Sequence, residues 1–178
     1  MCLVIFNRSD DDLRAVVDSF VAAIQQREQM RGLQFMQCFT KDRFPNIRQS
    51  AFDQWRDVVS NNLAVLHNTC QTYDNLNDAL WRLRNNNAVR GVGLSTINTT
   101  VQILSTLWDL DMDSNCWSVE SDDMVMFCNR NNITAQALVD GVAALDERLG
   151  DMALMDKVIV TNYLVKSDSI SLLNEEEE

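Results

Sequence analysis

Residues 45–87 read PNIRQSAFDQWRDVVSNNLAVLHNTCQTYDNLNDALWRLRNNN, and this stretch decides the predicted fold. Two series of side chains repeat every seven residues along it, a period that is typical of a helix and foreign to a strand. Pro45 suits a first helical turn, and no glycine follows before Gly91. We therefore predict one long helix over about 45–87, with a bend at Asn61-Asn62 or Asn68-Thr69. The first series is Phe52, Val59, Leu66, Tyr73 and Leu80, and the second is Trp55, Asn62, Thr69, Leu76 and Leu83.

The composition favours an all-α protein around this helix. The 178 residues include only five Gly and one Pro, and the turns of a many-stranded β fold need both. A hydrophobic content of 46% is enough for a sizeable core. We predict a single helical domain over residues 1–166, a bundle of about five helices around the long central one, followed by a flexible acidic tail over 167–178.

Capping residues mark the shorter helices. A polar residue with a side-chain oxygen precedes several apolar stripes of helical spacing, as it does at the N-cap of a helix. The last segment, up to Val165, is also predicted to be helical, although its run of β-branched residues around Val158–Val160 favours a strand. The predicted caps are Ser9 or Asp10, Ser95 or Thr96, Ser121 and Thr134.

An acidic stretch after Trp108 suggests specific chemistry. Its carboxylates fall at positions 1, 3, 5 and 12 of a twelve-residue loop, the spacing at which an EF-hand binds Ca²⁺. Ser114 stands where that loop needs glycine, Cys116 where it carries an apolar residue, and no second loop is present. An acidic linker without an ion is the alternative. The candidate metal ligands are Asp109, Asp111, Asp113, Glu120 and, through its carbonyl oxygen, Asn115.

No motif indicates an enzyme. His67 is the single histidine and has no acidic neighbour in sequence, so we assign it to the surface or to packing. Serine-nucleophile, phosphate-loop and dinucleotide signatures do not occur. Five scattered cysteines without a C-x-x-C pair argue against a zinc or redox site, and we assign them to the core. No cofactor is expected, apart from the Ca²⁺ of the acidic-loop hypothesis.

Charge is distributed unequally. Residues 1–100 carry 11 Lys/Arg and 10 Asp/Glu, whereas residues 101–178 carry 4 and 16, which makes +1 and −12 and gives the total of −11. This balance disfavours nucleic acid as a partner, although Arg82, Arg84 and Arg90 leave a nucleoprotein subunit as a second alternative. The unequal halves permit head-to-tail association between copies.

These observations lead to one functional hypothesis. We expect a non-enzymatic helical protein that binds another protein or copies of itself, in assembly or in an accessory structural role. Few lysines, many asparagines and unequal charge halves would suit a viral or phage subunit. No signal peptide or membrane span is recognisable, so we expect a cytoplasmic or nuclear protein that is not secreted. A calcium-responsive helical module built on residues 109–120 is the main alternative.

Overall fold

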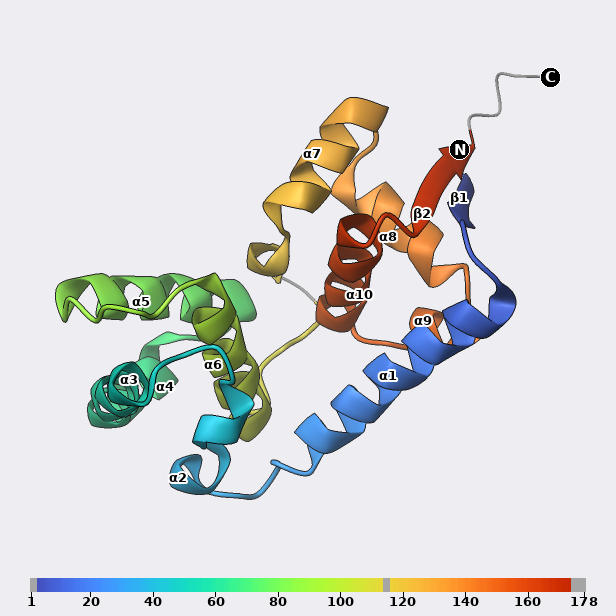
Figure 1. Ribbon diagram of the computed structural model, residues 1–178. Helices are drawn as coiled ribbons and strands as arrows, with labels where there is room; N and C mark the ends of the chain where they lie inside the picture. Colours follow the sequence, from blue (N-terminus) through green and yellow to red (C-terminus); the bar gives the residue numbers. More distant parts are fainter. Residues whose placement is uncertain (1–2, 114–115, 174–178) are drawn as a thin grey trace. The chain divides into compact units, whose positions relative to one another are not determined.

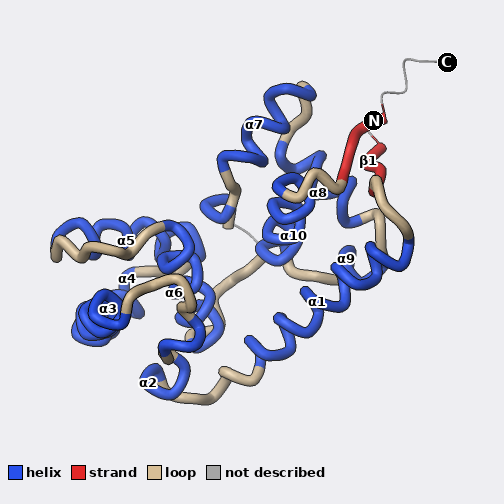
Figure 2. The backbone as a smooth tube through the Cα atoms, viewed as in Figure 1, coloured by secondary structure: helices blue, strands red, loops and turns tan. Residues whose placement is uncertain are grey.

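The computed structural model describes residues 3–113 and 116–173, and within them the chain is mostly helical (Figure 1). Ten α-helices, two 3₁₀ helices and one pair of strands are present there, which confirms the all-α prediction (Figure 2). None of the helices in the described part is long and apolar enough to span a membrane.

The chain forms two compact units. The terminal unit combines Met1–Ile24 with Val119–Glu178, and the central unit comprises Gln25–Ser118. Helix α1 (Asp10–Glu28) begins in the terminal unit, and its last four residues belong to the central unit. The expectation of one domain over residues 1–166 stays a prediction.

The predicted long helix is three helices in the central unit. They are α3 (Gln49–Asn61), α4 (Leu63–Thr69) and α5 (Tyr73–Asn86). The first break lies at the predicted bend, where Asn62 leaves the helical conformation with φ −114° and ψ 8° while its side-chain amide donates to Val58 O at 2.7 Å. A side chain that competes for backbone groups in this way favours a helix end.

The second break, at residues 70–72, directly follows the alternative predicted position Asn68-Thr69, because α4 ends at Thr69. Thr72 is extended, with φ −132° and ψ 164°, and its hydroxyl accepts a hydrogen bond from Asn75 N at 3.2 Å as the N-cap of α5. Pro45 is also placed differently from the prediction: it lies in a turn, because the chain forms a 3₁₀ helix at Lys41–Arg43 and α3 starts only at Gln49.

The residues of the first series are buried on all three helices, despite both breaks. Its five residues are at most 5% exposed, while the second series is fully buried at Trp55 and Leu76 and exposed at Thr69. The indole N–H of Trp55 donates to Thr100 Oγ1 at 3.0 Å, which satisfies its one polar group. The first series therefore lies in the core of the central unit, although it is divided among three helices.

The central unit is completed by an aromatic cluster and two more helices, α2 (Phe35–Cys38) and α6 (Leu94–Leu107). Phe39 stacks on Phe35 with the ring centroids 4.9 Å apart, and Phe44 lies 4.7 Å from Phe39 and 5.5 Å from Phe52. This cluster ties the segment before α3 to the core, and α6 packs against both α2 and α5.

The terminal unit joins both ends of the described chain in an antiparallel strand pair, β1 (Leu3–Phe6) and β2 (Ile170–Leu173). Residues 170–173 of the predicted tail are therefore a strand, and residues 174–178 lie outside the described residues. Burial of Ile170, the first residue of β2, stabilises this pairing, because its side chain is only 3% exposed. The acidic composition of residues 167–178 had led to the prediction of a flexible tail over the whole segment.

Four helices complete the terminal unit. The stretch that follows the predicted cap Thr134 forms two helices, because Asp146 Oδ1 accepts a hydrogen bond from Arg148 N at 2.8 Å and caps the second one. The Val158–Val165 segment is helical, as predicted. The helices are α7 (Asp122–Asn131), α8 (Ala135–Ala143), α9 (Glu147–Gly150) and α10 (Leu154–Lys166).

Candidate functional site

The predicted metal ligands have other partners or fall in different units. Asp109, at φ 52°, forms an ion pair with Arg31, and Asp111 Oδ1 accepts a hydrogen bond from Asp113 N at 2.8 Å. Asn115 lies outside the described residues. Glu120 belongs to the terminal unit, whereas the three aspartates belong to the central unit. Within residues 3–113 and 116–173, no three His, Cys, Asp or Glu side chains are grouped to hold a metal ion.

Apolar residues of the same stretch face the core. Met112 is 8% exposed and Cys116 is fully buried, and Asp111 forms an isolated parallel bridge with Thr72. Farther along, Ser118 N donates to Asp74 Oδ1 at 2.9 Å. These contacts fasten the described parts of the stretch to the central unit, in which it packs as a structural segment. The calcium hypothesis stays a prediction.

His67 and the cysteines have packing roles. The His67 ring is exposed on one side and stacks on Trp108 with centroids 4.9 Å apart. Cys38, Cys70, Cys116 and Cys128 are buried and free, as predicted for core residues. Burial, with a contribution from Asp74, raises the pKa of Cys116 to about 12, and burial also raises the pKa of Cys38 and Cys128. These three thiols are therefore protonated at neutral pH and poorly nucleophilic.

The three arginines of the nucleoprotein hypothesis differ in their surroundings. Arg84 Nε donates to Val92 O at 3.1 Å, and its Nη1 donates to Asn85 Oδ1 at 2.9 Å, so this side chain ties the end of α5 to the following loop. Arg82 and Arg90 are exposed.

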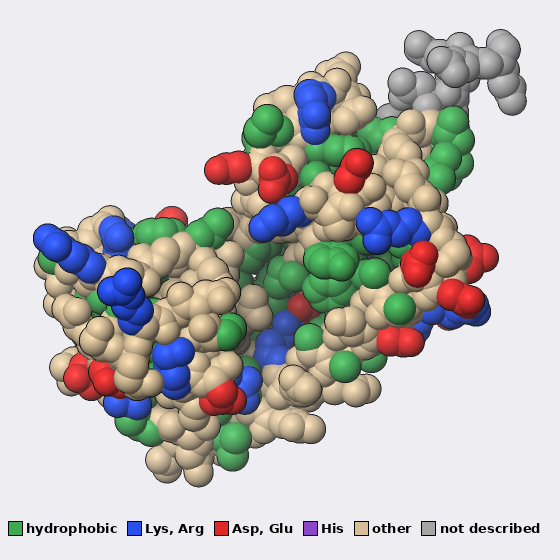
Figure 3. Space-filling view, viewed as in Figure 1, with side chains coloured by type: hydrophobic (Ala, Val, Ile, Leu, Met, Phe, Trp, Pro, Cys, Tyr) green, Lys and Arg blue, Asp and Glu red, His purple; other side chains and the backbone are tan. Residues whose placement is uncertain are grey.

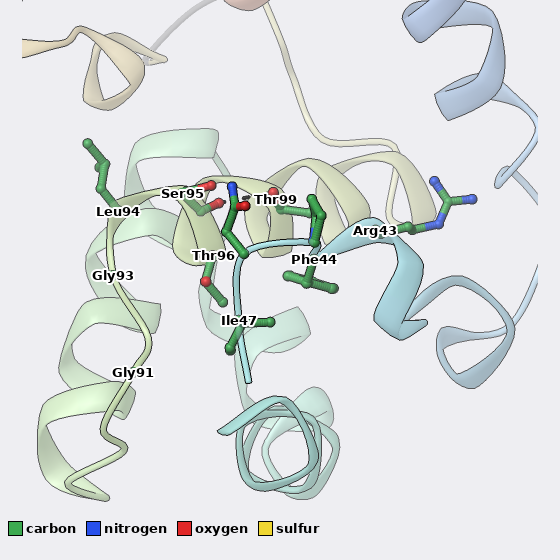
Figure 4. Close-up of a pocket in the computed structure, with 11 residues that line it drawn as sticks. Arg43, Phe44, Ile47, Gly91, Gly93, Leu94, Ser95, Thr96 and Thr99 are labelled. Atoms are coloured by element: carbon green, nitrogen blue, oxygen red, sulfur yellow. Dashed lines mark hydrogen bonds between the residues drawn. The ribbon is translucent and has the colours of Figure 1, made fainter. Parts of the chain in front are cut away.

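A concave site that sequence analysis missed lies at the N-terminus of α6. It is a pocket of about 230 Å³ between residues 43–47 and residues 91–99 of the central unit. Figure 4 shows Phe44 and Ile47 on one side and Ser95, Thr96 and Thr99 of α6 on the other. The Arg43 guanidinium points away from these hydroxyls. The pocket therefore combines an apolar wall with a row of hydroxyl groups.

The walls of this pocket are held by the core. Phe44 is 3% exposed and packs on Phe39 and Phe52, and Lys41 Nζ donates to its carbonyl oxygen at 3.0 Å. On the other side, Arg84 holds the carbonyl oxygen of Val92, one residue before Gly93. Gly93 and Phe44 line the same pocket although they are far apart in the sequence. No local sequence pattern predicts that tertiary packing brings their two segments together.

A second surface feature is the strand pair of the terminal unit. Leu3 and Leu173 lie opposite each other in the register and are 59% and 49% exposed. Val4 is 4% exposed and packs against α8, where its Cγ2 lies close to Gly141. The pair therefore has one face on the core and one apolar face toward solvent, and hydrophobic side chains are visible on the surface there (Figure 3).

Comparison of the chain with protein-family models, with curated proteins and with solved structures found no match.

Proposed function

We propose that this chain is a non-enzymatic helical assembly protein that associates with a second copy by pairing strand edges. The observation that carries the proposal is the exposed apolar face of the β1–β2 pair, with Leu3 beside Leu173. Exposed apolar residues that adjoin one another mark interaction surfaces, whereas single ones need no explanation.

The edges of the pair support the same proposal. In the described part of the chain β1 and β2 pair only with each other, so the outer edge of each strand has no strand partner there. Natural edge strands are usually protected by charged residues, proline or bulges. The strands read LVIF and ISLL, which include none of the charged residues or prolines.

A second copy is the occupant that fits these edges. Uncharged, apolar strands meet their own copies across a twofold axis without placing like charges opposite each other within the strands. The pairing would extend a two-stranded sheet to four strands, and sheets of three or more strands are the stable ones. Backbone hydrogen bonds would supply affinity, and Leu3 and Leu173 would supply a shared apolar face.

Light scattering after size-exclusion chromatography tests this proposal. We expect the wild-type chain to form a dimer whose fraction rises with concentration and Leu3→Lys to shift it to monomer. Val65→Lys is the matched control, because Val65 is 62% exposed on α4 in the central unit and gains the same charge. A wild-type monomer at the highest concentration, or equal loss of dimer in both variants, would overturn the proposal.

A further inference from the structure

The strand pair has two different outer edges, and its hydrogen-bond pattern shows which backbone groups face outward on each. Asn7 N donates to Ser169 O at 2.8 Å, and successive residues of an antiparallel pair bond alternately toward the partner strand and away from it. Val4 and Phe6 therefore turn their N–H and C=O groups away from β2. In the described part of the chain, no backbone hydrogen bond outside the strand pair uses these groups.

The outer edge of β1 is accessible. Helix α8 meets β1 through the side chain of Val4, whose Cγ2 lies close to Gly141, so this helix covers a face of the pair and not its edge. In Figure 1 β1 lies at the margin of the terminal unit, and Figure 3 shows hydrophobic side chains on the surface there. A strand of a second copy can therefore reach the outward groups of β1.

Charge distinguishes the two edges. The nearest charge before β2 is the exposed Asp168, and four glutamates follow this strand in the sequence, at residues 175–178. In a twofold antiparallel pair, the C-terminal end of each strand lies beside the N-terminal end of its copy. Pairing through β2 would therefore bring the glutamates of one copy toward Asp168 of the other, and like charges beside each other are destabilising.

Pairing through β1 brings opposite charges together. The nearest charge after β1 is the exposed Arg8, and Leu3 at the other end of β1 lies opposite Leu173. A twofold pair of β1 strands therefore places Arg8 of one copy at the end of the sheet where the glutamates follow Leu173 of the other copy. This charge complementarity favours the edge of β1 over the edge of β2.

We propose that the second copy pairs through β1, with Ile5 on the twofold axis. This inference rests on the proposed function and names the edge by which the copies meet. With Ile5 opposite its own copy, Val4 of one chain lies opposite Phe6 of the other, and the outward backbone groups of these two residues bond to each other. The half-buried Ile5 and the exposed Leu3 lie on the face opposite to Val4, so one apolar face continues across the dimer.

Amide hydrogen exchange in the ¹⁵N-labelled full chain, at concentrations below and above the midpoint of dimer formation, tests this pairing. We expect exchange of the Val4 and Phe6 amides to slow about tenfold when about nine-tenths of the chain is dimer, because exchange then proceeds through the remaining monomer. The Leu172 amide faces the outer edge of β2 and is the internal control, which should not slow.

A matched pair of charge reversals tests the register. Arg8→Glu should raise the dissociation constant of the dimer about tenfold at about 0.15 M salt, since it replaces an attraction between the copies by a repulsion. Arg130→Glu, at an exposed position of α7 in the same unit, makes the same change in net charge and should weaken the dimer much less.

The possible results separate this inference from the function on which it rests. A chain that stays monomeric at every concentration overturns both, and so does a dimer in which none of the three amides slows, because its copies then meet elsewhere. A dimer that slows Leu172 and leaves Val4 and Phe6 unchanged retains strand pairing and overturns the choice of β1. Equal weakening by Arg8→Glu and Arg130→Glu overturns the register with Ile5 on the axis.

Discussion

At the scale of single residues, burial decides which polar groups matter. Glu120 is half-buried just before Ser121, the N-cap of α7, and removal from water raises the pKa of its carboxyl group. An acid with a raised pKa in the folded state opposes folding while it is ionised. That penalty is present above the folded pKa and disappears as the pH falls through it.

Glu120→Gln should therefore stabilise the protein near neutral pH. We expect a higher urea midpoint than wild type at about pH 7 and a difference that shrinks toward about pH 4, where the carboxyl becomes protonated. Glu147→Gln, at an exposed position of α9, serves as the control. A gain that persists unchanged in acid would show that burial of the charge is not its cause.

At the scale of elements, the sequence predicted burial better than helix lengths, and it predicted most caps, although α6 begins at Leu94 behind Gly93 and not behind the predicted Ser95 or Thr96. Ser121 and Thr134 cap α7 and α8 as expected, because N-capping is a local interaction. The first series, from Phe52 to Leu80, is buried as expected, since apolar residues at helical spacing face the core. The prediction of a single helix through these residues was wrong, because local side-chain hydrogen bonds end α3 at Asn62 and start α5 after Thr72. The pocket was missed because it joins segments distant in sequence.

The packing of α8 on β1 makes a specific prediction about Gly141. A Cβ there would lie 2.4 Å from Val4 Cγ2, and the β-branched Val4 cannot easily turn aside. Gly141→Ala should destabilise the protein by about 1–3 kcal/mol in urea unfolding, despite the better helix propensity of alanine.

Two further variants separate the clash from other effects. In a Val4→Ala background the Gly141→Ala change should instead be neutral or stabilising by up to about 1 kcal/mol. Gly150→Ala should behave as an ordinary substitution, because its Cβ would meet only Ala143 O at 3.6 Å. The same loss in both backgrounds would mean that contact with Val4 does not set the cost.

At the scale of the whole molecule, the two units differ in charge. The central unit has 9 Lys/Arg and 9 Asp/Glu, a net charge of 0, and the terminal unit has 6 and 17, a net charge of −11. The proposed strand pairing joins two terminal units and therefore two bodies of like charge. Their repulsion is long-range and is screened by salt.

Self-association should therefore strengthen as salt rises. We expect sedimentation velocity to show more dimer at about 0.15 M salt, where the Debye length is about 8 Å, than at about 0.01 M, where it is about 30 Å. The opposite trend is expected for head-to-tail contact between unlike halves and would contradict pairing through the sheet. Leu3→Lys should show neither trend.

The pairing of β1 with β2 also has a consequence for synthesis on the ribosome. The terminal unit is assembled from both ends of the described chain, so Val4 meets its partner Leu172 only after the whole central unit and the residues up to 172 have been translated. The central unit is continuous in sequence and can begin to fold earlier, because domains fold as units during synthesis at about 5–20 residues per second. Until residues 170–173 have been translated, β1 is an apolar strand without its partner strand, and a nascent chain stalled before residue 170 would display it to chaperones.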